Sequence, residues 1–304
     1  MLNDLERVAI ESYRSSDLIE PNAEMGLEER AVFLGIHLLL EAGRLIRKSI
    51  GEVEPSDITV KEDGSPATEL ENRIETTLRS WLPRFDPEAV IIGEETGGAL
   101  PSKGVAVAID PIDGTRAFLA ETETFTTTLA LIRDGVARLG MVANPSTGDV
   151  SYGIAGGESR LIRLEVFGEE DVGVSLPGSS EEQRPTLVNI QPSRKAARVV
   201  RGLYRAWEEG AISMVRSPGG SPAWALVEAA RGHFTYANLW SQRAAECFDL
   251  AAGTLIVRGA GGEVTDLEGQ PIDELRHAGP FVAGLDPADR LKVRDLLRRG
   301  LGAE

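Results

Sequence analysis

The chain has 304 residues, of which 42% are hydrophobic and 26% are charged, and its net charge at pH 7 is −16. This length suffices for one large or two modest domains with a buried core. The negative charge argues against a nucleic-acid polymer as a partner, because phosphate backbones repel such a surface. Residues 1–13 are polar and acidic, unlike a signal peptide, and no apolar run approaches the roughly 20 residues of a membrane span. The single cysteine, Cys247, excludes an internal disulfide and fits a reducing cytoplasm, and three scattered histidines give no zinc-binding spacing.

The first part of the chain alternates helical and extended patterns. Residues 1–25 are polar and are expected to form a loose or briefly helical leader. Apolar residues three and four positions apart predict an amphipathic helix over 26–50, and a second helix is expected over 68–82, before Pro83. Short apolar runs predict the strands of this part, at 90–93, 105–109, 126–133, 136–144 and 149–153.

An acidic stretch with Gly, Ser and Pro over 168–186 separates an N-terminal α+β lobe, 26–185, from a C-terminal α/β lobe, 186–304. The strands expected in the second lobe lie at 187–191, 212–216, 233–237, 263–266 and 280–285, and the helices at 194–209, 222–231, 250–257 and 287–299. Helices that alternate with mixed strands predict a layered α/β fold.

The strand at 105–109 ends in the motif D-P-I-D-G-T, which contains Asp110 and Asp113. Pro111 lacks an N–H, so the strand is expected to stop there. Two carboxylates at one strand end can point at one spot, and Mg²⁺ is held by one or two carboxylates with phosphate oxygens of a substrate. The N–H groups after Gly114 would hold that phosphate. A strand-loop-helix corner whose aspartates only cap is the alternative, and this motif alone leaves both open.

Other segments also place acids or glycines at the ends of elements. Glu94 and Glu95 follow the strand at 90–93, and at most one of them is expected to bind a metal, since consecutive side chains point in different directions. Glu71 either caps its helix in a capping box with Thr68 or serves the site. Asp249 is either the N-cap of an apolar helix or reaches inward to a metal. The turn at 219–221 is either a second anion seat or simply a turn.

The order and spacing of these acids resemble the inositol monophosphatase family of lithium-sensitive, magnesium-dependent phosphatases. The matching motifs are G-E-E at 93–95, D-P-I-D-G-T at 110–115 and F-D-L-A-A-G at 248–253, with D-G-S-P-A-T at 63–68 before the first acid. The resemblance implies an α-β-α-β-α sandwich with mixed sheets. Homodimers are common in that family, although the sequence of this chain does not itself indicate one.

The resemblance also implies two to three Mg²⁺ ions and a set of ligands for them. Glu94 and Asp110, with the carbonyl of Ile112, would hold the first ion. Asp110 would bridge to a second ion, which Asp113 and Asp249 complete. A third and weaker ion would share Glu94.

Further roles follow from the same resemblance. Thr115 and Glu71 would orient or deprotonate the attacking water, while the amides of Gly114 and Thr115 would grip the phosphate. Glu95 would support the metal ligands without binding an ion. Two positions depart from the family pattern: Glu71 stands where an aspartate is usual, which puts the rate in question, and Phe248 stands where tryptophan is usual, which concerns packing.

Substrate choice is expected to lie in the second lobe, where Gly220 and Ser221 would contact the substrate and the loop 240–246 carries Gln242, Arg243 and Glu246. The sequence predicts a Mg²⁺-dependent phosphomonoesterase for a small phosphorylated metabolite, foremost an inositol or another polyol or sugar monophosphate. The run R-A-F-L at 116–119 resembles histidinol-phosphate phosphatases, and F-T-T-T-L-A-L-I-R-D-G at 125–135 resembles 3′(2′),5′-bisphosphate nucleotidases. A catalytically silent member that binds a phosphorylated ligand is the alternative from another class.

Overall fold

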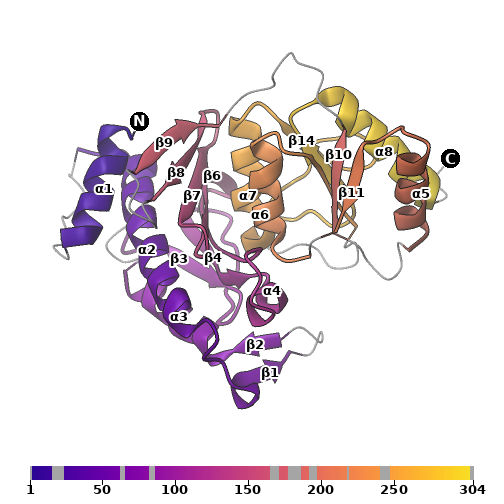
Figure 1. Ribbon diagram of the computed structural model, residues 1–304. Coiled ribbons are helices and arrows are strands. Elements are labelled where there is room, and N and C mark those ends of the chain that lie inside the picture. The colour runs from indigo at the N-terminus through magenta and orange to yellow at the C-terminus, as the bar shows by residue number, and fades with distance from the viewer. Residues whose placement is uncertain are drawn as a thin grey trace.

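The computed structural model describes residues 2–15, 24–61, 66–81, 86–164, 171–176, 186–191, 197–217, 219–239 and 247–301. Its elements form five layers, in the order helices, sheet, helices, sheet, helices (Figure 1). The predicted α/β sandwich with mixed sheets is therefore confirmed.

The larger sheet is formed by strands between residues 90 and 175. Its seven strands are β3 (Val90–Gly93), β4 (Val105–Asp113), β5 (Thr126–Arg133), β6 (Val136–Asn144), β7 (Asp149–Ile154), β8 (Ser159–Arg163) and β9 (Val172–Ser175), in that order across the sheet. β3 and β4 are parallel and all other neighbours are antiparallel. Residues of β5 are buried on both faces of the sheet because helices cover both.

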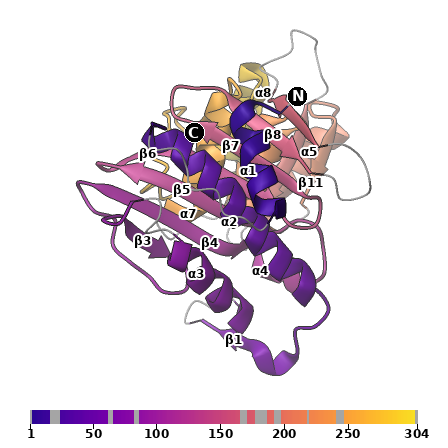
Figure 2. The same ribbon diagram turned by 90° about the vertical axis from the view of Figure 1, so that its left-hand side faces the viewer.

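One face of this sheet carries α1 (Asp4–Ser15), α2 (Leu27–Ser49) and α3 (Glu69–Trp81) (Figure 2). The start of the chain was expected to be loose or briefly helical, and α1 is a three-turn helix that buries Ala9 and Ile10 in the core. Its polar sequence hid this role because the helix also buries Glu6, which pairs with Arg160 of β8 and accepts the hydroxyl of Tyr152.

The prediction that the strand ends before Pro111 is also wrong, because β4 continues to Asp113. A register shift between Asp110 and Asp113 marks a β-bulge, where a residue without an N–H breaks no regular ladder. The carbonyl of Pro111 instead accepts the hydroxyl of Thr127 at 2.8 Å.

The middle layer and the smaller sheet come from the second half of the chain. α6 (Pro222–Ala230) and α7 (Cys247–Gly259) lie between the two sheets (Figure 1). The smaller sheet consists of β11 (Met214–Arg216), β10 (Leu187–Gln191), β12 (Thr235–Asn238), β14 (Phe281–Gly284) and β13 (Glu263–Thr265), in that order. α5 (Ala197–Glu208) and α8 (Pro287–Leu301) cover its outer face.

The remaining elements are short: a 3₁₀ turn (Pro55–Asp57), β1 (Ile58–Val60), β2 (Pro66–Thr68) and α4 (Thr115–Leu119). The two sheets fall on either side of the boundary predicted near residue 186, and the division into lobes stays a prediction. Within the part of the chain that the structure describes, no helix combines the length and the apolar character that a membrane span requires.

Candidate active site

Three segments that are distant in sequence meet at one end of the larger sheet. β3 and β4 run parallel with Gly93 beside Ile109, and the N–H of Glu94 donates to the carbonyl of Ile109 at 3.2 Å. Glu94 and Asp110 therefore lie next to each other on adjacent strands, at the same end of the sheet. Thr128, the partner of Asp110 across the sheet, donates its hydroxyl to the carbonyl of Phe248 at 3.0 Å. This bond holds the first turn of α7 against that end of the sheet.

Asp249 lies in this first turn, one position after Phe248. Its side chain lies outside the part of the molecule that the structure describes, and so does the whole loop 240–246 with Gln242, Arg243 and Glu246. The predicted metal contact of Asp249 and the predicted substrate contacts of the loop therefore stay predictions.

Asp110 and Asp113 are both buried, with 2% and 5% of their surface exposed. An oxygen of Asp110 accepts the N–H of Ile112 at 2.9 Å, within the bulge. One oxygen of Asp113 accepts the hydroxyl of Ser221 and the N–H of Ala223, the latter at 2.9 Å. Asp113 thus occupies the N-terminal end of α6, where free N–H groups favour an anion. Burial, and in addition the charge of Glu94, raises the pKa of Asp113 above its usual value.

At Gly114 the two turns that were expected to bind phosphate, D-G-T at 113–115 and the turn at 219–221, come into contact. Gly114 begins α4 with φ +93°, and a Cβ there would lie 2.8 Å from the backbone nitrogen of Ser221. Only glycine fits both the left-handed conformation and this close approach. The turn at 219–221 is therefore adjacent to the D-G-T turn. The carboxylate of Asp113 already accepts an N–H group at the start of α6. A substrate phosphate is therefore expected to bind at the N–H groups that follow Gly114 instead.

Glu71 makes contacts that fit both of the alternatives that the sequence left open. One carboxylate oxygen accepts the N–H and the hydroxyl of Thr68, which is the glutamate half of the predicted capping box. The other oxygen accepts the hydroxyl of Thr115 at 2.8 Å. The Thr115 hydroxyl also lies 3.3 Å from the carbonyl of Ile112. Glu71 is fully buried, and this desolvation raises its pKa from 4.5 to about 7.

Lys61 introduces a positive charge that the sequence did not predict here. Its ammonium lies 2.7 Å from an oxygen of Glu94 and 2.6 Å from an oxygen of Glu95. Burial by itself lowers the pKa of Lys61, but its hydrogen bonds to these two carboxylates raise it above the usual lysine value. In this arrangement a protein cation neutralises Glu94, the predicted ligand of two ions.

The donor set suits a hard divalent cation, since carboxylate and carbonyl oxygens are the ligands that Mg²⁺ prefers. Burial raises the pKa of Asp113 and the charge of Glu94 raises it further, so a cation beside this carboxylate would favour its ionised form. Among the side chains that the structure describes, no three acids, histidines or cysteines lie close enough together to hold a metal. The set of ligands therefore stays a prediction, with Asp249 as its undescribed member.

Sequence reasoning missed several residues that build this region. Lys61 precedes the D-G-S-P-A-T motif, and its position at the end of a strand was the available signal. Glu75 lies four residues after Glu71 on the same face of α3 and is fully buried. Thr126 contacts Ser221, with 2.7 Å between their hydroxyl oxygens, and belongs to an alternating run that predicted only a strand.

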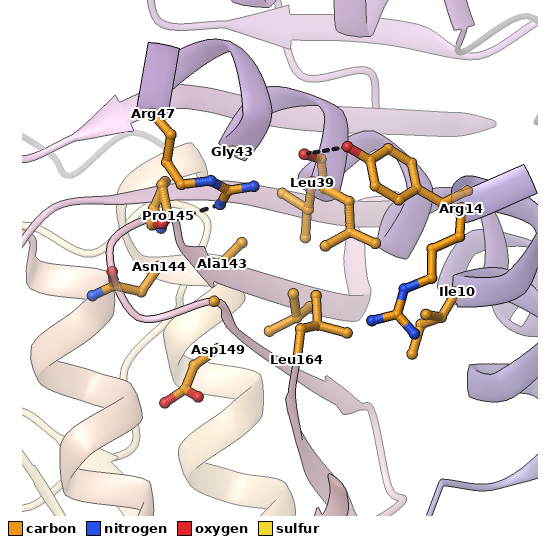
Figure 3. Close-up of a pocket in the computed structure, with 14 residues that line it drawn as sticks. Ile10, Arg14, Leu39, Gly43, Arg47, Ala143, Asn144, Pro145, Asp149 and Leu164 are labelled. Atoms are coloured by element: carbon orange, nitrogen blue, oxygen red, sulfur yellow. Dashed lines mark hydrogen bonds between the residues drawn. The ribbon is translucent and has the colours of Figure 1, made fainter. Parts of the chain in front are cut away.

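A cavity of about 310 Å³ lies elsewhere, between α1, α2 and the hairpin of β6 and β7 (Figure 3). Ile10, Leu39 and Leu164 form part of its apolar wall. Arg14 at its edge pairs with Asp171, and Arg47 donates to the carbonyl of Pro145. None of the described residues that line this cavity belongs to the predicted site.

Comparison with known proteins agrees with these motifs. Residues 28–292 match the model of the inositol monophosphatase family. The 3′(2′),5′-bisphosphate nucleotidase CysQ of Escherichia coli is 28% identical, covering 84% of this chain and 97% of that protein. The histidinol-phosphatase of Mycobacterium tuberculosis is also 28% identical, covering 78% and 88%. The solved structure of an IMPase from Thermotoga maritima has a TM-score of 0.74 at 21% identity, covering 89% of this chain and 98% of that one. From the family match and the shared fold we conclude that the chain belongs to the inositol monophosphatase family of phosphatases.

Proposed function

We propose that the chain is a Mg²⁺-dependent phosphomonoesterase that hydrolyses a small phosphorylated metabolite. The observation that carries this proposal is the contact between Thr115 and Glu71 beside the acid-bearing end of the larger sheet. A buried carboxylate with a raised pKa next to a hydroxyl is an arrangement suited to accept a proton from water near neutral pH.

In the proposed mechanism the ionised Glu71 accepts the proton of the attacking water, either directly or through the hydroxyl of Thr115, to which it is hydrogen-bonded. The backbone N–H groups of Gly114 and Thr115 would bind the phosphate at the start of α4. Glu94, Asp110, Asp113, Asp249 and the carbonyl of Ile112 would hold two to three Mg²⁺ ions, which neutralise the phosphate dianion and lower the pKa of a bound water.

The electrostatics support a metal requirement. A phosphate dianion would be repelled by the carboxylates of Glu94, Asp110 and Asp113. The described cation in contact with this group is Lys61, which already pairs with two acids. Substrate binding therefore depends on added positive charge, and we expect lithium, a small cation, to inhibit as the family resemblance implies.

An inositol or another polyol or sugar monophosphate is the first substrate that we propose. The second candidate is a 3′(2′),5′-bisphosphate nucleotide, which is favoured by the motif at 125–135 and by the similarity to CysQ. Histidinol phosphate is a third, through the motif at 116–119 and the relative from M. tuberculosis.

A phosphate-release assay over four esters tests the proposal: inositol 1-phosphate, fructose 1,6-bisphosphate, histidinol phosphate and adenosine 3′,5′-bisphosphate, each with Mg²⁺, with EDTA and with Li⁺. We expect release that requires Mg²⁺ and falls with Li⁺, with one ester clearly preferred. Asp110→Asn should lower kcat by about a hundredfold or more, because it removes a charge that the transition state needs. Asp149→Asn is the matched control, since Asp149 is an equally buried aspartate that pairs with Arg163 and Arg231. No Mg²⁺-stimulated release from any ester would instead indicate a silent, ligand-binding member.

A further inference from the structure

Glu75 is a buried acid for which the mechanism above has no use. It lies on α3 four residues after Glu71 and has no exposed surface. One carboxylate oxygen accepts the N–H of Glu95 at 2.9 Å. The other accepts the hydroxyl of Thr96 and the Nε–H of Arg79, the latter at 3.0 Å. Two of these three partners belong to the turn that follows β3.

Arg79 continues the same set of contacts. Placed four residues after Glu75 on α3, it donates to Glu75 and also to the carbonyl of Gly97 at 3.1 Å. The turn is closed by two backbone bonds between Gly93 and Gly97, of 3.1 Å and 2.9 Å. The residues between them include Glu94. Glu75 is therefore bonded to the middle of the turn that carries Glu94, and Arg79 is bonded to its end.

The fit between Glu75 and the turn is tight enough to dictate a residue. A Cβ at Gly93 would lie 1.8 Å from a carboxylate oxygen of Glu75, so no side chain can be placed there without moving Glu75. A side chain in place of the glycine of the G-E-E motif would therefore displace the carboxylate that α3 supplies to this turn.

A buried charge is costly unless each of its oxygens is bonded. A carboxylate kept at such a position needs a reason beyond packing. Residues four apart lie on the same side of a helix, so one face of α3 presents Glu71 to Thr115 and Glu75 to the turn of Glu94. The rigid helix therefore sets the spacing between the proton acceptor and a predicted metal ligand.

We propose that Glu75, supported by Arg79, is a positioning residue that holds Glu94 in place for Mg²⁺. This proposal rests on the proposed function, because it assigns Glu94 to the metal. Glu75 itself touches neither substrate nor metal. Its removal should weaken Mg²⁺ binding and leave the chemical step at saturating Mg²⁺ nearly unchanged.

The main test is Glu75→Gln, which keeps the shape but places an NH₂ group either where the N–H of Glu95 or where Thr96 and Arg79 need an acceptor. We expect the Mg²⁺ dissociation constant, measured by calorimetry without substrate, to rise about tenfold or more. The Mg²⁺ concentration for half-maximal activity should rise by the same factor, while kcat at saturating Mg²⁺ and KM for the ester change less than about threefold. Hydrogen exchange at the amides of 94–97 should accelerate.

Two further variants keep the test decisive. Thr96→Val, at an exposed position, removes one donor to Glu75 and should raise the Mg²⁺ dissociation constant about two- to fivefold, with little further effect in the Glu75→Gln background. Glu6→Gln is the matched control, because Glu6 is an equally buried glutamate whose partner is Arg160. It should lower the melting temperature and leave the Mg²⁺ dissociation constant unchanged.

Unchanged Mg²⁺ binding in folded Glu75→Gln, or in Thr96→Val where Glu75→Gln does not fold, would overturn the proposal. An equal loss of Mg²⁺ binding in Glu6→Gln would do so as well, since the effect would then be general destabilisation. If the wild-type chain bound Mg²⁺ but released phosphate from no ester, the proposed function would fail, while the calorimetric comparison would still support or overturn the role of Glu75.

Discussion

The two carboxylate oxygens of Glu71 accept hydrogen bonds from two different segments. One oxygen caps α3 through Thr68, and the other accepts the hydroxyl of Thr115. The capping bond fixes the side chain in one orientation, which holds the second oxygen at 2.8 Å from Thr115. In the proposed active site, the residue that caps the helix is therefore also the residue that contacts Thr115.

The raised pKa of Glu71 makes the stability of the metal-free protein depend on pH. Its pKa is 4.5 in the reference state and about 7 in the folded protein, because burial disfavours the charged form. The folded state thus holds a proton that the unfolded state has lost between these pH values. The contribution of Glu71 is fully present below about pH 4.5 and is lost as the pH rises through about 7, by up to about 3 kcal/mol.

Urea unfolding in EDTA at pH 5 and pH 8 measures this dependence. Glu71→Gln cannot titrate but retains an acceptor oxygen, so the fall in the free energy of unfolding between the two pH values should be smaller than in the wild type. An equal fall in the free energy of unfolding in the two proteins would mean that Glu71 has the same pKa in the folded and unfolded states.

Lys61 is expected to act as a substitute cation when Mg²⁺ is absent. In Lys61→Met the carboxylates of Glu94 and Glu95 lose the ammonium that lies within 2.7 Å of both. The variant should melt about 3 °C lower in EDTA, for a loss of about 1 kcal/mol. Saturating Mg²⁺ should raise its melting temperature by more than it raises that of the wild type. Thermal denaturation with and without Mg²⁺ tests this prediction. An equal rise in the melting temperature of both proteins would contradict competition between Lys61 and the ion.

At the level of single elements, the start of α6 is held by one side chain. Ser221 caps the helix by accepting the N–H of Trp224 at 2.8 Å, and it donates its hydroxyl to Asp113. Its oxygen also lies 2.7 Å from the hydroxyl oxygen of Thr126 in β5. The cap therefore joins α6 to the larger sheet and to an acid of the predicted metal site.

Ser221→Ala should cost about 1–3 kcal/mol of unfolding free energy, because it removes a helix cap and leaves a buried carboxylate with one donor fewer. Urea denaturation measures the loss. The comparison variant Ser49→Ala removes a hydroxyl that bonds within its own helix, to the carbonyl of Leu45, and should change stability by less than about 0.5 kcal/mol. Equal losses in the two variants would mean that the cap on α6 and the bond to Asp113 add nothing to stability.

Periodicity predicted most elements correctly and failed where tertiary contacts override local rules. The strands predicted at 126–133 and 136–144 match β5 and β6 in both bounds. Pro111 misled the prediction because a bulge, visible only once β5 is paired, accommodates it. The burial of the polar α1 was not predicted, because its buried charge has its partner, Arg160, 154 residues away. Lys61 and Glu75 were missed for the same reason, since their partners lie on another segment.

Across the whole molecule, α7 is the helix on which both halves pack. Its residues contact the larger sheet on one side and α6 and the smaller sheet on the other. Gly140 in β6 allows the helix to approach, because a Cβ there would lie 2.5 Å from backbone atoms of Ala252. The first turn of α7 carries Asp249, so the depth of this packing also sets the position of a predicted metal ligand.

Gly140→Ala should therefore destabilise the protein by about 1–3 kcal/mol and weaken Mg²⁺ binding, because the added methyl group displaces α7 from the sheet. Gly202→Ala is the matched control. Gly202 lies in α5 with no atom within 4 Å of the added Cβ, and alanine is the better helix former, so stability should stay equal or rise by up to about 1 kcal/mol. Thermal melts and Mg²⁺ calorimetry on both variants test this, and a neutral Gly140→Ala would contradict the close approach.

The bond between Thr128 and Phe248 joins residues 120 positions apart. During synthesis the ribosome delivers β4 and β5 long before α7 exists, so the nascent polypeptide exposes Asp110 and Asp113 without the last acid at 249. Under the proposed function, a product released early by interrupted translation would lack a ligand of the metal ion and would not hydrolyse phosphate esters.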